Sequence, residues 1–97
     1  MLLQKLMDSI DEIEDTYREA GWELNVSLPF TTNRVEIAFH RNHGPQLGKM
    51  VFPLYKSGHT TFVSEVASNA ASDKIYVICR KIEKARRSLS SDGMLLF

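Results

Sequence analysis

The sequence is short of the features that produce disulfide-bonded, membrane-spanning or secreted proteins. It has a single cysteine, Cys79, in 97 residues, so no disulfide framework is expected, and this usage fits a reducing cytosol. No apolar run approaches the roughly 18 residues of a membrane span. The opening segment Met1–Met7 is followed directly by acidic residues and has neither the basic region nor the apolar stretch of a secretory signal. We therefore expect one cytosolic domain without membrane contact.

The net charge is zero, but the charged residues are unevenly spread along the chain. Residues 1–23 hold seven acidic and two basic residues, for a net charge of −5. Residues 24–97 hold five acidic and ten basic residues, for a net charge of +5. This asymmetry indicates either an electrostatic partner or two segments that complement each other within the fold. Half of the ten bases lie in one stretch, as Arg80, Lys81, Lys84, Arg86 and Arg87.

Apolar residues recur at helical spacing near both ends of the chain. The first series predicts a helix over residues 2–20 with an acidic solvent side, and Gly21 directly after it is a typical helix stop. The second predicts a helix from Lys74 to about Ser90, preceded by Ser72-Asp73 as an N-cap. The two series are Leu3, Leu6, Ile10, Ile13, Tyr17 and Ala20, and then Ile75, Ile78, Ile82, Ala85 and Leu89.

Alternation of apolar and polar residues predicts strands between these helices. Residues 22–28 and 34–40 alternate in this way and indicate an antiparallel hairpin. Residues 49–55 form a third predicted strand, in which Pro53 favours an edge position or a bulge, because proline cannot donate to a strand ladder. Residues 42–48 are predicted to be a loop from their glycine and proline content.

The segment 61–71 fits two structures. Phe62, Val66 and Ala70 have the spacing of a short helix, which we favour, whereas residues 60–63 could instead extend the sheet. With the helix, the order of elements is α-β-β-β-α-α. The predicted fold class is then α+β, a three-stranded antiparallel sheet with helices packed on one face. Residues 1–93 would form this single domain, and residues 94–97 an apolar C-terminal tail.

Few residues are of the types that carry catalysis or bind metal. The histidines His40, His43 and His59 belong to no nucleophile signature, and no glycine-rich phosphate loop is present. The spacing of His40 and His43 could supply two zinc ligands, but a structural zinc site needs about four. Cys79 is expected to be a small, partly buried thiol within a helix. We expect no catalytic residue, no metal ion and no cofactor.

Three segments are candidates for binding a macromolecule. The basic stretch 80–87 could neutralise phosphates, although no aromatic stacking platform lies within it. The element order is similar to that of double-stranded-RNA-binding domains, whose basic signature at the start of the last helix is missing here. The acidic first helix could mimic a phosphate backbone, although such a face is more often simply solvated. The third segment, His43-Gly44-Pro45, is similar to the exposed Gly-Pro ligands that cyclophilin-type prolyl isomerases bind, although an ordinary turn has the same composition.

With these segments in place, the chain resembles the anti-RecBCD proteins of lambdoid phages. The resemblance covers the whole length and rests on general character, namely the opening Met1–Met7, the acidic helix, the hairpin, the His43-Gly44-Pro45-Gln46 loop and the basic final helix. It implies a protein that binds the host RecBCD helicase–nuclease, mainly through its RecC subunit, and protects phage DNA ends, with at most an indirect contact to DNA. It also implies a host cyclophilin-type prolyl isomerase as a partner. Within the segment His43–Gln46, Gly44 and Pro45 would make that contact.

No motif in the sequence identifies the surface that would bind the host enzyme. Interfaces of this kind combine exposed apolar anchors with a charged rim. The basic helix and the apolar tail are the segments with that character. The candidate contacts are therefore Arg80, Lys84, Arg87, Leu95, Leu96 and Phe97. The alternative function is a small nucleic-acid-binding domain that uses the basic C-terminal helix, which salt-dependent binding to bare DNA or RNA would favour.

Overall fold

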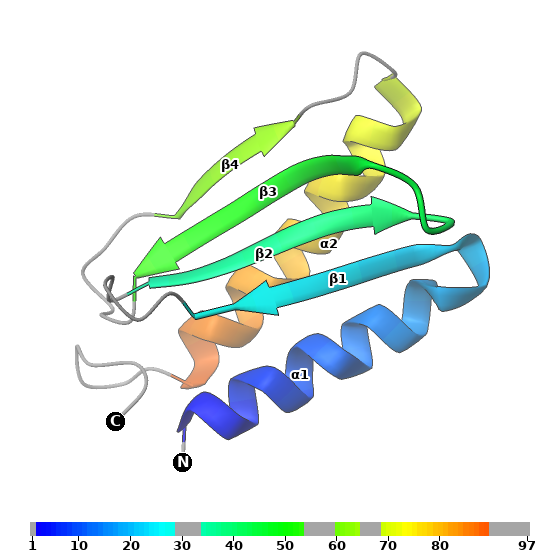
Figure 1. The fold of residues 1–97 in the computed structure, drawn as a ribbon. Helices are drawn as coiled ribbons and strands as arrows, with labels where there is room; N and C mark the ends of the chain where they lie inside the picture. Colours follow the sequence, from blue (N-terminus) through cyan, green and yellow to red (C-terminus); the bar gives the residue numbers. More distant parts are fainter. Residues whose placement is uncertain (1, 29–33, 54–59, 65–68, 90–97) are drawn as a thin grey trace.

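The computed structural model describes residues 2–28, 34–53, 60–64 and 69–89 (Figure 1). Four strands form one antiparallel sheet in the order β1-β2-β3-β4, and both helices lie against the same face of it (Figure 1). The α+β class, with helices on one face of an antiparallel sheet, is thus confirmed. The elements in chain order are α1 (Leu2–Tyr17), the 3₁₀ helix η1 (Arg18–Ala20), β1 (Trp22–Ser27), β2 (Arg34–Arg41), β3 (Gln46–Pro53), β4 (Thr61–Ser64) and α2 (Asn69–Leu89).

The predicted three-stranded sheet and the order α-β-β-β-α-α are wrong, because residues 61–64 form a fourth strand. β4 pairs antiparallel with β3, from Gly48↔Ser64 to Val51↔Thr61. Its β-branched residues favour an extended backbone. Phe62 points the other way from its neighbours, and its ring centroid lies 4.5 Å from that of Tyr76 on α2. This contact with the helical layer outweighs the spacing of Phe62, Val66 and Ala70, from which a short helix was predicted. Ala70 belongs to α2. Val66 lies outside the described residues.

The last helix begins earlier than predicted. α2 starts at Asn69 rather than at Lys74, so the predicted N-cap Ser72-Asp73 lies inside the helix. Residues 70 and 71 are alanines, the strongest helix formers, and they favour this extension. Its end at Leu89 is within one residue of the prediction.

The third strand lies in the interior of the sheet, so the predicted edge position is wrong. β3 pairs with β2 on one side and with β4 on the other. The pairing of β3 with β4 ends at Val51, and Pro53 follows as the last residue of β3. The missing N–H of Pro53 therefore removes no hydrogen bond between these two strands. A register shift does occur, but at the opposite end of the strand. There Phe39 pairs with Gly48 and His40 with Gln46, which leaves Leu47 as the extra residue.

The hydrophobic core lies between the sheet and the two helices. The predicted helical stripes supply Leu6 and Ile10 from α1 and three isoleucines of α2, all buried. The predicted alternation is confirmed in β1 and β2, whose apolar residues face this core. The remaining buried residues are Trp22, Leu24, Val35, Ile37, Phe39, Met50, Phe52 and Cys79. In the described part of the chain, no helix is both long and apolar enough to cross a membrane.

The two helices lie side by side and run in opposite directions (Figure 1). Tyr17, the last residue of α1, contacts α2. Its ring lies under two lysines of α2, with centroid-to-Nζ distances of 5.4 Å to Lys74 and 5.1 Å to Lys81. These cation–π contacts join the two helices near the C-terminal end of α1.

Candidate functional site

The connection between β2 and β3 is a tight turn, shorter than the predicted loop over residues 42–48. Only Asn42–Pro45 lie between the strands, since Gln46 is already the first residue of β3. Asn42 and His43 have φ angles of 53° and 58°, and the Gly44 N–H donates to the Arg41 carbonyl at 3.0 Å. This hydrogen bond spans two successive residues of left-handed conformation, which is the definition of a type I′ turn. Such a turn suits the right-handed twist of a hairpin.

The Gly44–Pro45 peptide follows this turn directly and lies at the surface. Among the described residues no peptide bond is cis, so Gly44–Pro45 is trans. Its carbonyl, Gly44 O, lies 3.0 Å from His40 Nδ1; because a carbonyl only accepts, the imidazole Nδ1 donates this bond. Pro45 and His43 are exposed, while Gly44 and Gln46 are half-buried. The four residues predicted to contact an isomerase are thus contiguous and partly accessible.

The turn is fastened to the corner between η1 and β1, which lies some twenty residues earlier in the chain. The Asn42 N–H donates to the Gly21 carbonyl at 2.8 Å. Gly21 has a φ of 89°, and a Cβ built there would meet Asn42 Oδ1 at 1.9 Å. Only glycine combines this backbone conformation with so close an approach. A second link joins Arg41 Nε to the Ala20 carbonyl at 2.9 Å.

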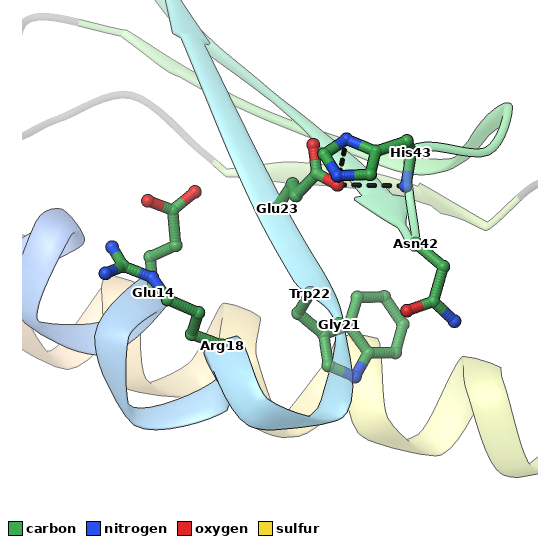
Figure 2. A pocket seen from close by; sticks show the side chains of 7 residues that line it. All are labelled: Glu14, Arg18, Gly21, Trp22, Glu23, Asn42 and His43. Carbon is green, nitrogen blue, oxygen red and sulfur yellow. Dashed lines mark hydrogen bonds and ion pairs between the residues drawn. The ribbon is translucent and has the colours of Figure 1, made fainter.

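The side chain of Glu23 completes the attachment of the turn to β1 (Figure 2). The Oε1 atom of Glu23 lies 2.9 Å from the backbone N of His43, which donates to it, and 3.0 Å from the His43 Nδ1 atom. The His43 side chain is otherwise 92% exposed. A single carboxylate therefore fixes both the backbone and the ring of the outermost residue of the turn.

A groove of about 480 Å³ runs over the start of β1, between α1 and the turn (Figure 2). At its α1 side, the Glu14 carboxylate accepts a hydrogen bond of 2.6 Å from the Leu24 N–H, a donor at the free edge of β1. Trp22 is buried beneath the groove, with the Arg41 guanidinium 5.6 Å from its ring centroid. The groove is lined by Glu14, Arg18, Gly21, Trp22, Glu23, Asn42 and His43. No group of three or more metal-ligating side chains occurs here or elsewhere in the described segments.

The five bases of the C-terminal stretch have three different surroundings. Lys81 lies over Tyr17, and Arg86 is buried, with 4% of its surface exposed. Arg80, Lys84 and Arg87 are exposed, and at 3.6 residues per turn they fall within an arc of about 60° on the side of α2 away from the core. These three are the candidate contacts on the helix. Leu95, Leu96 and Phe97, the candidate contacts in the tail, lie outside the described residues.

Arg86 belongs to a polar cluster that the sequence did not lead us to expect. Its guanidinium donates to Glu83 Oε1 at 2.8 Å and to Thr60 Oγ1 at 3.2 Å, and lies 5.3 Å from the centroid of the Phe52 ring. Thr60 also donates to Glu83 at 2.6 Å, and Arg87 at 3.0 Å. Burial alone would raise the pKa of Glu83, but these hydrogen bonds outweigh it and lower the pKa to about 2.

A signal for this buried arginine is present in the sequence. Arg86 follows Ile82 by four residues, so it continues the apolar stripe of α2, whereas Ala85, which was assigned to that stripe, is only half-buried. Cys79, also on the inner side of α2, has 7% of its surface exposed. Burial, and to a smaller extent the Glu83 carboxylate, raise the pKa of its thiol to about 12, so the sulfur is a packing group rather than a nucleophile.

Comparison of the chain with protein-family models, with curated proteins and with solved structures found no match.

Proposed function

We propose that this chain is a partner-binding domain that modulates a host helicase–nuclease of the RecBCD type, mainly through RecC, and so protects phage DNA ends in the host cytosol. The resemblance described above supplies the identity of this partner. The structural observation that supports a binding role is the preformed turn Asn42–Pro45, which is largely exposed and yet fixed by hydrogen bonds to Gly21 and to Glu23 of β1. A rigid protruding segment loses little conformational entropy when it binds.

A cyclophilin-type prolyl isomerase of the host is the second proposed partner, and it would contact His43–Gln46. Pro45 is exposed, and Gly44 has no side chain that would hinder entry of the segment into a groove. The bond from His40 to the Gly44 carbonyl favours the trans amide that is present. An isomerase that turns this amide has to compete with that bond, so loss of the imidazole in His40→Ala should ease turnover at Pro45.

Calorimetric titration of the isomerase into the protein tests this contact. Pro45→Ala should abolish binding, whereas Pro53→Ala, at the end of β3, is the matched control and should leave it unchanged. Equal binding by the wild type and Pro45→Ala would contradict the proposed contact. Absence of binding to the wild type, both alone and in the host complex, would contradict it as well.

The contact with the host enzyme is tested by affinity capture of purified RecBCD without DNA. The wild type should form a stable complex. Removal of two exposed charges of α2, in Arg80→Gln with Lys84→Gln, should weaken capture. Lys5→Gln with Arg34→Gln removes two exposed charges elsewhere and should leave capture unchanged. Absence of a complex with the wild type would sink the proposal, and equal loss in both double variants would contradict the role of α2.

One observation favours the alternative function of nucleic-acid binding. Arg80, Lys84 and Arg87 face solvent on one side of α2, where three cations could contact successive phosphates. The acidic surface of the adjacent α1 opposes this by repelling a phosphate backbone. Binding to bare DNA or RNA that weakens steeply with salt and is lost in Arg80→Gln with Lys84→Gln would favour this alternative over the proposed function.

A further inference from the structure

The exposed side of α1 carries a row of acidic side chains. Asp8, Glu12 and Asp15 are spaced four and three residues apart and are all exposed. At 3.6 residues per turn they lie within an arc of about 60°, directed away from the core residues Leu6 and Ile10. We call these three residues the acidic stripe. Asp15 also pairs with Arg18, the first residue of η1.

The exposed side of α2 carries the opposite charge in the same pattern. Arg80, Lys84 and Arg87 are spaced four and three residues apart and are exposed, and we call them the basic stripe. Arg87, 76% exposed, also contacts Glu83. Among the described residues, none of the ion pairs joins α1 to α2. The two helices are neighbours, but their charges point outward and do not neutralise each other.

The two stripes are also level with each other along the helices. Tyr17 of α1 lies between Lys74 and Lys81 of α2, and the helices run in opposite directions (Figure 1). Since both helices rise 1.5 Å per residue, positions 8–15 of α1 lie beside approximately positions 80–87 of α2. The outer surface of the helical layer therefore presents an acidic and a basic row side by side, of similar length and at the same height.

We propose that this helical surface binds a second copy of the chain and that the two copies form a symmetric dimer. A two-fold axis parallel to the helices and midway between them places α1 of each copy over α2 of the other. Each acidic stripe then faces a basic stripe at the same height, with Arg80 near Glu12 and Asp15 of the partner copy. A two-fold axis perpendicular to the helices would instead place acid on acid and base on base.

The geometry of this dimer agrees with the general requirements for symmetric association. A two-fold interface has to be self-complementary, because the same patch serves both subunits, and paired rows of opposite charge meet that condition. Each facing helix pair is antiparallel, so the helix dipoles also attract. The surface is separate from the turn Asn42–Pro45, but it shares Arg80, Lys84 and Arg87 with the proposed contact to the host enzyme. Dimer formation and binding of the host enzyme would therefore compete. Association of the purified chain is measured without the host enzyme, so its outcome is independent of the proposed function. Since exposed ion pairs dominate it, the dimer should be weak and sensitive to salt.

Sedimentation equilibrium of the wild type over a concentration series is the first test. At about 20 mM NaCl the protein should show a monomer–dimer equilibrium, and at about 500 mM its apparent dissociation constant should rise by about tenfold or more, since screening shortens the range of the charges. A monomer at all concentrations and both salt levels would overturn the proposal. Open-ended association into higher polymers would overturn the two-fold arrangement.

Exchanging the stripes is the second test. Glu12→Lys with Asp15→Lys reverses two of the three charges of the acidic stripe and should abolish dimerisation, as should Arg80→Glu with Lys84→Glu, which does the same to the basic stripe. In the chain with all four substitutions the net charge is that of the wild type, positions 12 and 15 again face positions 80 and 84 with opposite charge, and Asp8 still faces Arg87. This variant should dimerise again, with salt dependence like that of the wild type. Circular dichroism and thermal unfolding of each variant confirm folding.

A matched control separates this surface from net charge alone. Asn25→Lys with Ser27→Lys adds two charges at exposed positions of β1 and should leave the dimer constant within about twofold, because these side chains lie far from the helical layer. The proposal would be overturned by a folded fourfold variant that stays monomeric. It would also be overturned if the two double variants, each changed in one stripe, still dimerised as the wild type does.

Discussion

Arg86 and Glu83 face each other on the inner side of α2, one turn apart. The Arg86 guanidinium, with 4% of its side chain exposed, donates to both carboxylate oxygens of Glu83, at 2.8 and 3.2 Å. Thr60, just before β4, donates to the same carboxylate at 2.6 Å. The pair therefore connects α2 to the start of the strand that sequence periodicity did not predict. A charge buried at this depth is stable only while its partner remains.

Removing the arginine should leave Glu83 with a half-buried and poorly compensated charge. We expect Arg86→Ala to lower the free energy of unfolding by about 3 kcal/mol, the scale measured when one member of a buried pair is removed. Arg87→Ala is the control, because Arg87 contacts the same carboxylate but is 76% exposed, and it should change stability by less than about 1 kcal/mol. Urea denaturation measures both values; equal midpoints for the two variants would contradict the structural role of Arg86.

The same cluster makes stability depend on pH in the acidic range. The pKa of Glu83 falls from 4.5 to about 2 in the fold, so the unfolded chain takes up the proton first. Its stabilisation is complete above about pH 4.5 and is lost as the pH falls from there towards 2. Urea midpoints of the wild type should decrease through this window. In Glu83→Gln they should be lower at neutral pH and should decrease less on acidification; parallel pH profiles would exclude this contribution.

The helical stripes predict the residues whose truncation is most damaging. Ile10 and Ile82 are 1% and 0% exposed, on α1 and α2 respectively. Replacing either by alanine removes buried methylene groups and leaves a cavity, so each variant should lose about 2–5 kcal/mol of stability. Lys5→Ala, at an exposed position of α1, should change it by about 0.5 kcal/mol or less. Denaturant midpoints like that of the wild type in both isoleucine variants would be incompatible with this core.

Sequence periodicity predicted those parts of the fold in which one residue pattern dominates over many residues. Both long helices and the β1–β2 hairpin belong to this class, since their apolar stripes or alternation continue for six residues or more. β4 has only four residues, and Phe62 fits a helical and an extended pattern equally well. The choice between them depends on pairing with β3 and on contact with Tyr76. Neither of these contacts is local in the sequence.

The candidate site was predictable only in its local chemistry. Gly44 and Pro45 marked the turn by residue type, but the partners that fix it come from a distant segment. Gly21 and Glu23 meet the turn because β1 and β2 pair in the register Trp22↔Arg41. A shift of one residue would place their contacts on the opposite face of the sheet. Gly21 could be recognised from the sequence as a helix stop, but its close approach to Asn42 could not.

The last prediction concerns this contact between Gly21 and Asn42. Alanine at position 21 would adopt a φ of 89° and place its Cβ 1.9 Å from Asn42 Oδ1. Two separable effects therefore act together: backbone strain of about 1–3 kcal/mol and a collision with a side chain that has to move. Asn42→Gly removes the side chain and still permits the positive φ of 53° at that position. Gly21→Ala should consequently destabilise the Asn42→Gly protein less than it destabilises the wild type.

A double-mutant cycle by urea denaturation gives the coupling free energy between Gly21 and Asn42, expected at about 0.5–3 kcal/mol for residues in direct contact. Additive effects of the two substitutions would mean that strain alone accounts for the cost at Gly21, and that the turn is not held against the η1–β1 corner by this contact.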